Sequence, residues 1–491
     1  MKEVIASNTH YRIEGYELGD NTRIENFSSI WDEIRHQYIP LYTYDEESKT
    51  LRIPRGIDPN KIESMLEGRV VYDKEVGGRK VTFSMNTTPR NAVQRKAIRF
   101  LTGEDEYGYT RSASQLVLSL PSGGGKTYCA VAAMSLYGLA TMIIVHTDEL
   151  RVQWVERISS YSNIPQSSIV SLKSSDSMHE YMNKDRKTTK KISGETVYII
   201  THSLLRSYVS RYGYDGLSEL FKRLGIGVKI VDEAHKEFRN IIDIDNSVSV
   251  YKNIYLTATF GRTSEIENRI FQRVFQDVYK LKVTDEELGV EKNVVYISEL
   301  FTSKATRLEI QGMRNGRGPV SKFSIHKYMD YALAKGVLAE SYKVWLAYFI
   351  EKLKIDGMIL VISPKKESCR YFMEIAKELY PDKKCCVYTS DSKVDNVEEY
   401  DVVCATAKMF GTGNDIDSIK VMINMEPMGS AINIYQIFHR LMRGNDTETR
   451  YYLDIIDKSV TNVYDMYKRC KPTLESVAKK HIVMDTTKKR K

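Results

Sequence analysis

Short runs of apolar and β-branched residues alternate with longer helical segments, and this alternation occurs in two successive stretches of the 491-residue chain. In the first stretch, residues 86–300, the runs are QLVLSL (115–120), TMIIVH (141–146), TVYIITH (196–202), GVKIVDE (227–233) and NIYLTAT (253–259). In the second, residues 327–491, they are GMILVIS (357–363), KCCVYT (384–389), YDVVCAT (400–406), KVMINME (420–426) and TRYYLDII (449–456). Such alternation is typical of parallel sheets covered by helices on both faces. The sequence therefore predicts an α/β protein with two parallel-sheet lobes in series.

The first part of the chain has a different pattern. Residues 39–56 and residues 68–85 each have the pattern of a β-hairpin, with a double glycine at the turn of the second. Between them, Asp58 precedes a run that predicts a short capped helix. We therefore expect a small α+β domain over residues 1–85. Residues 301–326, rich in Gly, Arg and Ser, are expected to form a linker or inserted loop between the lobes.

Composition narrows the class of protein. The formal net charge is +8 and the chain ends in KKRK, a basic excess that fits a surface for phosphate groups. No uninterrupted apolar run reaches the roughly 18 residues that a membrane-spanning helix requires. The N-terminus meets acidic residues too early for a secretory signal, and the six cysteines show neither a CxxC pair nor zinc spacing. We therefore expect a cytoplasmic protein that binds nucleic acid and no membrane.

The segment PSGGGKT (121–127) follows one expected strand and begins an expected helix. Three glycines allow the backbone to wrap closely around phosphate oxygens, and the first N–H groups of a helix bind anions. Lys126 would reach the β- and γ-phosphates, and the hydroxyl of Thr127 would hold Mg²⁺. The segment therefore predicts a site for ATP and Mg²⁺. The binding residues predicted in it are Ser122, Gly123, Gly124, Gly125, Lys126 and Thr127.

The second signal is the acidic segment VDEAH (231–235), at the end of the apolar run GVKIV (227–231). Polar residues at the carboxyl end of a parallel strand face the ligand crevice of such sheets. Asp232 is the expected partner of the magnesium shell, and Glu233 the residue that orients or deprotonates the attacking water.

These motifs, in this order and spacing, resemble those of superfamily 2 helicases, and are similar to the XPB-like and phage UvsW-like branch. The resemblance rests on PSGGGKT, VDEAH, LTAT (256–259) and QIFHRLMR (436–443), and spans residues 86–457. It implies two tandem RecA-like lobes and an ATP-dependent DNA helicase or translocase, plausibly encoded by a bacteriophage. The UvsW-like group implies branched DNA as substrate, with branch migration and fork remodelling in recombination and repair. By position alone, residues 1–85 would sense the duplex or the branch.

The resemblance also assigns roles in the first lobe. Gln94 matches a glutamine that contacts adenine, although the residue alone is equally compatible with a solvent-facing position on a helix. Thr147 and Thr201 lie in segments similar to those that contact the nucleic-acid backbone, and ordinary loops are the alternative. Thr257 and Thr259 resemble the motif that couples hydrolysis to lobe movement.

In the second lobe, ATAKMFGTGNDI (405–416) resembles the motif that touches nucleotide and nucleic acid. The matching positions are Gly411, Thr412, Gly413 and Asp415, with Thr412 expected at the nucleic acid and Gly413 and Asp415 at the nucleotide. Gln436, Arg440 and Arg443 match the last motif, in which Gln436 would contact the nucleotide and the arginines would reach the γ-phosphate. His439 departs from the family, which usually has glycine there.

Other functions remain open on the sequence alone. An RNA helicase or a helicase of transcription would carry nearly the same motifs, because backbone contacts dominate. A restriction-system motor lacks support from a methyltransferase or convincing nuclease segment, and a binding protein on an inactive scaffold is disfavoured by the complete set of catalytic residues. We expect ATP, Mg²⁺ and DNA as ligands, RNA as an alternative polymer, and a monomer.

Overall fold

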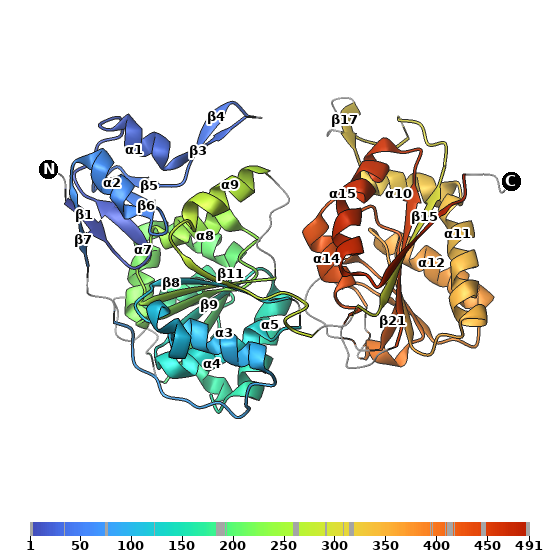
Figure 1. Ribbon diagram of the computed structural model, residues 1–491, viewed down its shortest axis with the longest axis horizontal. Helices are drawn as coiled ribbons and strands as arrows, with labels where there is room; N and C mark the ends of the chain where they lie inside the picture. The colour runs from blue at the N-terminus through green and yellow to red at the C-terminus, as the bar shows by residue number, and fades with distance from the viewer. Residues whose placement is uncertain are drawn as a thin grey trace. The chain divides into compact units, whose positions relative to one another are not determined.

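The chain forms two compact units, Met1–Leu288 and Gly289–Lys491, each described here by itself. The computed structural model describes residues 3–487 except 34, 74–76, 122, 183–191, 193, 259–264, 290–291, 308, 314–318, 393, 395, 408, 410–415, 417 and 443–447. The first unit holds a small N-terminal domain and a large sheet, and the second holds another large sheet (Figure 1). Within the described residues, no helix has the length and apolar character to cross a membrane.

The N-terminal domain is built on a five-stranded sheet of order β5-β6-β2-β1-β7. Its strands are β1 (Glu3–Ala6), β2 (His10–Ile13), β5 (Thr43–Asp45), β6 (Thr50–Pro54) and β7 (Arg69–Tyr72). Two helices, α1 (Thr22–Phe27) and α2 (Pro59–Leu66), accompany the sheet. The carboxylate of Asp58 accepts a hydrogen bond from the N–H of Asn60 at the start of α2, which confirms the predicted helix and its cap.

The two predicted hairpins fare differently. The first is present, but β5 is the partner of β6, while β4 (Gln37–Pro40) pairs with β3 (Ser29–Asp32). The second is wrong, because β7 pairs in parallel with β1 and the chain then runs along the large sheet. Gly78 of the double glycine allows the backbone to pass close to Gly227 instead of forming a turn, because a Cβ on Gly78 would lie 2.4 Å from the Cα of Gly227.

The large sheet of the first unit has seven parallel strands in the order β10-β11-β9-β12-β13-β8-β14. They are β8 (Gln115–Ser119), β9 (Thr141–Val145), β10 (Ile169–Ser171), β11 (Val197–Thr201), β12 (Val228–Val231), β13 (Lys252–Thr257) and β14 (Tyr279–Lys282). The five predicted strand runs all lie in this sheet. Apolar burial on both faces explains why the runs are almost continuously hydrophobic.

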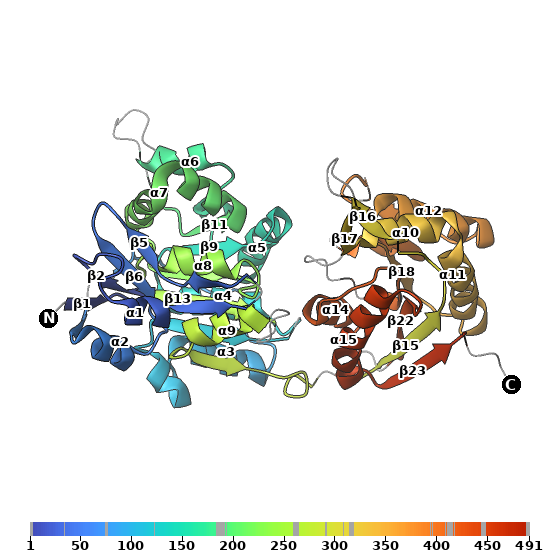
Figure 2. The same ribbon diagram turned by 90° about the horizontal axis from the view of Figure 1, so that it is seen from above.

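Helices cover both faces of this sheet (Figures 1 and 2). One face packs against α3 (Ala92–Thr102), α4 (Lys126–Tyr137) and α5 (Asp148–Tyr161). The other packs against α7 (His202–Leu224), α8 (Phe238–Asp245) and α9 (Glu265–Val274). Successive strand residues alternate between the two cores, so that Ile143 joins the first and Ile144 the second.

The second unit repeats the plan with seven parallel strands in the order β19-β20-β18-β21-β22-β15-β23. These are β15 (Val294–Phe301), β18 (Met358–Ile362), β19 (Cys385–Tyr388), β20 (Val402–Ala405), β21 (Ile419–Asn424), β22 (Arg450–Asp457) and β23 (Lys480–Asp485). One face packs against α11 (Val337–Ala347) and α12 (Lys366–Leu379), the other against α14 (Ala431–Phe438) and α15 (Thr461–Val477). The α/β class with two parallel sheets and a small N-terminal α+β domain is thereby confirmed.

The boundary between the two units lies between Leu288 and Gly289, earlier than the predicted boundary at residue 300. β15 lies between β22 and β23, and this buried eight-residue strand belongs to the second unit. The expected linker, residues 301–326, instead contains the small hairpin of β16 (Gln311–Met313) and β17 (Pro319–Phe323) and the start of α10 (Ile325–Ala334). A strand with apolar residues on both faces needs two neighbours, which explains why β15 joins the sheet.

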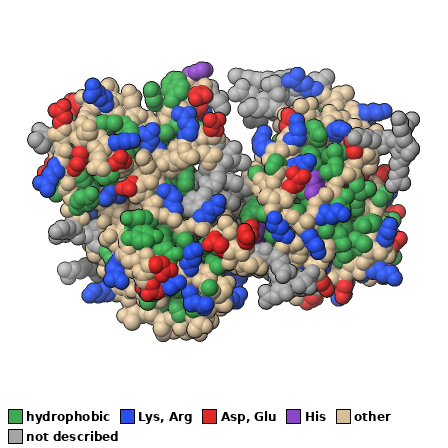
Figure 3. All heavy atoms as spheres, in the orientation of Figure 1, with side chains coloured by type: hydrophobic (Ala, Val, Ile, Leu, Met, Phe, Trp, Pro, Cys, Tyr) green, Lys and Arg blue, Asp and Glu red, His purple; other side chains and the backbone are tan. Residues whose placement is uncertain are grey.

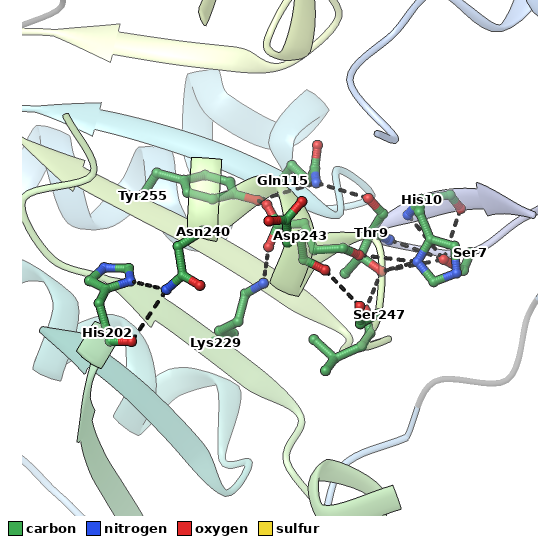
Figure 4. Close-up of polar contacts among 12 residues, drawn as sticks. Ser7, Thr9, His10, Gln115, His202, Lys229, Asn240, Asp243, Ser247 and Tyr255 are labelled. Atoms are coloured by element: carbon green, nitrogen blue, oxygen red, sulfur yellow. Dashed lines mark hydrogen bonds and ion pairs between the residues drawn. The ribbon is translucent and has the colours of Figure 1, made fainter. Parts of the chain in front are cut away.

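Buried polar contacts hold the N-terminal domain on the large sheet (Figure 4). The Nδ1 atom of His10 lies 3.1 Å from the carbonyl oxygen of Asp245, at the end of α8. The side-chain amide of Gln115, on β8, donates to the carbonyl oxygen of Thr9 at 3.5 Å and to the hydroxyl of Tyr255 at 3.3 Å. The first unit is therefore a single packed body that includes the N-terminal domain.

We expect the stability of the first unit to fall as pH falls below about 6.5. Burial, helped by the charge of Arg52, lowers the pKa of His10 to about 3. A histidine in the unfolded chain has a pKa of about 6.5, so between these values only the unfolded state binds this proton. The loss should reach about 2 kcal/mol at pH 5. Thermal unfolding at pH 7 and pH 5 measures this loss of stability.

Two variants test the assignment to His10. His10→Gln should reduce the pH-dependent loss of stability, whereas His326→Gln, which replaces an exposed histidine, should not. Equal losses in the wild type and both variants would contradict the assignment.

Candidate nucleotide-binding and catalytic site

The glycine loop, residues 121–125, connects β8 to α4 in the centre of the first unit. Gly123 and Gly125 have φ angles of +79° and +87°, a region that residues with a Cβ rarely adopt. The N–H of Gly124 donates to the carbonyl oxygen of Pro121 at 3.0 Å, which closes the turn. The loop therefore needs its glycines for backbone geometry, and it leads directly into the N-terminus of a twelve-residue helix.

Gln94 lies on α3 and is packed against this loop. Its side chain is 5% exposed, so the solvent-facing alternative is wrong. Its Oε1 atom accepts a hydrogen bond from the N–H of Arg90 at 2.8 Å, and a Cβ on Gly125 would lie 2.2 Å from its Nε2 atom. A side chain at position 125 would therefore displace the amide of Gln94 and would also be strained by the φ of +87°, and the contact of Gln94 with adenine stays a prediction.

Lys126 and Thr127 are the first two residues of α4. The ammonium group of Lys126 donates to the carbonyl oxygen of Leu120 at 3.2 Å, so it lies across the base of the loop. The helix N-terminus adds unpaired N–H groups and a partial positive charge at the same place. This arrangement suits the binding of a phosphate chain.

Asp232 follows β12, whose neighbours in the sheet are β9 and β13. Its carboxylate accepts hydrogen bonds from the indole Nε1–H of Trp154 at 2.8 Å and from the N–H of Glu233 at 2.9 Å. Burial, and next the negative charge of Glu233, raise the pKa of Asp232 to about 6, while Trp154 and the charge of Lys126 oppose this rise. Asp232 is therefore a buried carboxylate that interacts electrostatically with Lys126. A divalent cation bound beside it would stabilise its charged form.

Glu233, His235 and Thr257 form a connected group. Nδ1 of His235 lies 3.1 Å from a carboxylate oxygen of Glu233 and 3.2 Å from the hydroxyl of Thr257. Glu233 has a φ of +50°, a conformation that costs energy for a residue with a side chain and that is common at functional sites.

The backbone joins the same elements. The N–H of Leu120 donates to the carbonyl oxygen of Thr257 at 3.2 Å, and the N–H of Ala234 donates to that of Leu256 at 2.9 Å. The glycine loop, the acidic segment (residues 231–235) and the end of β13 therefore meet at one edge of the sheet. This edge brings together Gln94, Gly123, Gly124, Gly125, Lys126, Thr127, Asp232, Glu233 and Thr257.

Two residues of this site were not predicted as functional. Trp154 orients Asp232, and His235 links Glu233 to Thr257. His235 stands two positions after Glu233, so the motif itself contained a signal for it. Trp154 lies on α5, 78 residues from Asp232, and only the packing of α5 against the sheet reveals its role.

Thr147 lies two residues after β9, and Thr201 is the last residue of the neighbouring strand β11. Each caps the helix that follows: the Thr147 hydroxyl accepts from the N–H of Leu150 at 3.4 Å, and that of Thr201 from the N–H of Leu204 at 3.3 Å. Helix capping accounts for both hydroxyls, and contact with nucleic acid stays a prediction.

In the second unit, Gln436 lies on α14 and Arg440 follows its end. His439 and Arg440 are 1% and 7% exposed, so the residue that departs from the family is part of the core. The remaining candidate positions lie outside the described residues: Ser122, Thr259, Gly411, Thr412, Gly413, Asp415 and Arg443.

Comparison with known proteins agrees with this site. Residues 87–262, which contain the glycine loop and the acidic segment, match the family model of the type III restriction enzyme res subunit. The transcript termination protein A18 of Yaba-like disease virus is 21% identical over 370 residues, which cover 72% of this chain and 69% of the relative.

Solved structures are similar at lower levels. T4 UvsW is 16% identical, with 99% of each chain covered and a TM-score of 0.37. A variant of S. cerevisiae Dbp5 bound to Gle1 and IP6 is 10% identical, with 81% of this chain and 89% of that chain covered and a TM-score of 0.49. Scores in this range say nothing about the substrate of the present chain.

Residues 87–262 therefore resemble the type III restriction enzyme res subunit, and each unit of the chain is built on a seven-stranded parallel sheet. The site fits a magnesium nucleotide, because it offers a glycine loop that a Cβ would obstruct, a helix N-terminus with Lys126, and a buried carboxylate at Asp232.

Proposed function

We propose that this protein is an ATP-driven motor that moves on branched DNA. The observation that carries the proposal is the meeting of the glycine loop, the acidic segment and Thr257 at one sheet edge. There, Nδ1 of His235 lies 3.1 Å from the carboxylate of Glu233, the residue expected to act on water. The same atom lies 3.2 Å from the hydroxyl of Thr257, at the strand end that the resemblance associates with movement.

In this proposal the bound magnesium ion supplies charge neutralisation at the phosphates. The glycine loop and the first turn of α4 bind the phosphate chain, and Lys126 holds its outer oxygens. Thr127 and Asp232 would hold the metal, and Trp154 fixes the carboxylate of Asp232 by its 2.8 Å hydrogen bond. Glu233 orients the attacking water and accepts its proton, while His235 holds the Glu233 carboxylate.

The proposal assigns the transition-state cations to Arg440 and Arg443. A planar guanidinium that reaches the γ-phosphate stabilises charge that develops only during transfer. We expect Arg443→Ala to lower turnover by about 10³-fold or more while ATP binding stays largely intact. Steady-state hydrolysis and binding of a fluorescent nucleotide measure the two effects. Unchanged turnover would remove Arg443 from the mechanism.

Two substrates are supported for the proposed motor. The net charge of +8 fits phosphate contact in general, and the motif resemblance to UvsW-like helicases favours branched DNA. A motor acting on transcription complexes is the second candidate, favoured by the similarity to a transcript termination protein over 72% of the chain.

Steady-state ATP hydrolysis would test the proposal. It should be measured without polymer and with single-stranded DNA, duplex DNA, a four-way junction and RNA, and Glu233→Gln provides the blank. Stimulation greatest with the junction would support the branched-DNA motor and justify a branch-migration assay. Stimulation by RNA alone would replace it with an RNA-directed function, and no turnover above the blank with any polymer would overturn it.

A further inference from the structure

The β3–β4 hairpin of the N-terminal domain has one buried and one exposed face. In its register, Ile30 pairs with Ile39 and Trp31 with Tyr38, so the two pairs point to opposite faces. Ile30 is 5% exposed and belongs to the core between the large sheet and its covering helices. On the other face, Trp31 is 37% and Tyr38 53% exposed, with their ring centroids 5.1 Å apart.

Arginines from the large sheet's helices hold this hairpin in place. Arg269 on α9 donates to the carbonyl oxygen of Trp31 at 3.3 Å, and Arg273 on α9 donates to that of Phe27 at 3.0 Å. Arg239 on α8 donates to the carbonyl oxygen of Pro40 at 3.3 Å. The hairpin is thus fastened at both strands to the two helices that follow the acidic segment and β13.

Arginines lie beside the exposed rings, and each is paired with an acidic group of the hairpin. Arg35, at the hairpin turn, has a side chain that is 70% exposed. The carboxylate of Glu33 lies 3.7 Å from Arg269, and that of Asp32 lies 3.8 Å from Nε of Arg35 and accepts a hydrogen bond from the backbone N–H of Arg35 at 3.2 Å. Figure 3 shows hydrophobic side chains beside a histidine at the edge of the molecule where Figure 1 draws this hairpin.

We propose that Trp31 and Tyr38 form a stacking surface for unpaired nucleic-acid bases, held rigidly on the ATP-binding unit. Exposed aromatic rings beside cations are the chemistry with which proteins bind single strands, because every base has a π-face. Two adjacent rings on a rigid hairpin lose little conformational freedom on binding. The inference rests on the proposed function, in which the motor meets unpaired bases where strands separate.

The tryptophans provide a direct readout. The chain has three, and Trp154 and Trp345 are only 2% and 6% exposed, so Trp31 is the one that solvent quenchers reach most easily. Binding of oligo-dT, oligo-U or a forked DNA should quench Trp31 emission and protect it from acrylamide, whereas a blunt duplex should not. The Trp31→Phe variant should lose this signal. The dT and U arms distinguish DNA from RNA as the source of the bases.

Binding affinity provides the second measurement. The double variant Trp31→Ala with Tyr38→Ala should bind forked or single-stranded polymer at least about tenfold more weakly by fluorescence anisotropy, with blunt-duplex affinity unchanged. Trp31→Phe with Tyr38→Phe keeps two rings and should retain most of the affinity. Tyr109→Ala, which removes a tyrosine that is 51% exposed outside the hairpin, is the matched control and should change nothing.

The outcomes separate this inference from the proposed function. If polymers stimulate hydrolysis but Trp31 emission stays unchanged and the double variant binds forks normally, the stacking surface is wrong and the motor stands. If no polymer stimulates hydrolysis, the motor is wrong, and the fluorescence and anisotropy measurements still decide on the hairpin. Equal loss of fork and duplex affinity in the double variant would also overturn base stacking.

Discussion

Replacing Glu233 by glutamine should reduce ATP turnover by about 10²–10⁴-fold while nucleotide binding is retained, because the amide cannot accept the proton of the attacking water. The 3.1 Å contact with Nδ1 of His235 would also be weakened, since an amide carries no negative charge. Lys126→Ala should abolish turnover and weaken nucleotide binding as well, because it removes the cation at the base of the glycine loop. Single-turnover hydrolysis and binding of a fluorescent ATP analogue, measured side by side, separate these two effects.

Glu237 offers a matched control for Glu233. It lies four residues further along the chain, also with a positive φ, and its carboxylate pairs with Arg206. Glu237→Gln should keep near-normal turnover in the presence of nucleic acid. Glu233→Gln with wild-type turnover would remove Glu233 from the catalytic role, and an equal loss in both variants would point to a general effect on the acidic segment.

Replacing Lys229 by methionine should lower the free energy of unfolding of the first unit by about 3–5 kcal/mol, because it leaves the Asp245 carboxylate buried without its cation. The two side chains are 0% and 4% exposed and form an ion pair, and the hydroxyl of Tyr255 donates to Asp245 at 2.6 Å. Burial raises the pKa of Asp245, because this position disfavours an uncompensated negative charge. Urea denaturation of the full chain measures the loss.

A second substitution tests the cause of that loss. Lys229→Met combined with Asp245→Leu removes both charges and should recover much of the stability, since an apolar pair carries no desolvation penalty. Lys49→Met breaks an exposed ion pair with Glu17 and should leave the unfolding midpoint unchanged. If the double variant is no more stable than Lys229→Met, packing volume rather than buried charge is the cause.

The sequence predicted those parts of the fold that depend on residues close together in the chain. The strand runs, the cap of α2 at Asp58 and the loop before Lys126 each depend on a few neighbouring residues, and all are present in the structure. The sequence did not predict β10 and β14 of the first large sheet or β15 and β23 of the second, and β15 and β23 pair across long stretches of chain. A run such as β15 shows its strand character, but its choice of sheet depends on tertiary packing.

In the site, too, the features set by neighbouring residues were predicted, and those set by tertiary packing were not. Asp232 and Glu233 were predictable because a polar pair ends an apolar strand, and the structure places them beside the glycine loop. The burial of Gln94 under Gly125 and the hydrogen bond from Trp154 to Asp232 were not predictable from spacing, since each joins two elements through the packing of a helix on the sheet. Residues 410–415 and 443 lie outside the described part of the chain, so their roles stay predictions.

The shared core beneath the β3–β4 hairpin limits how this protein can be divided. Ile30 and Leu41, from the N-terminal domain, lie in the same apolar cluster as Phe238 and Ile241 of α8. A shortened chain that begins near residue 86 would expose that cluster to water and should aggregate, so point substitutions are the better way to study the N-terminal domain. Any exchange of this domain for another would have to supply new partners for α8 and α9.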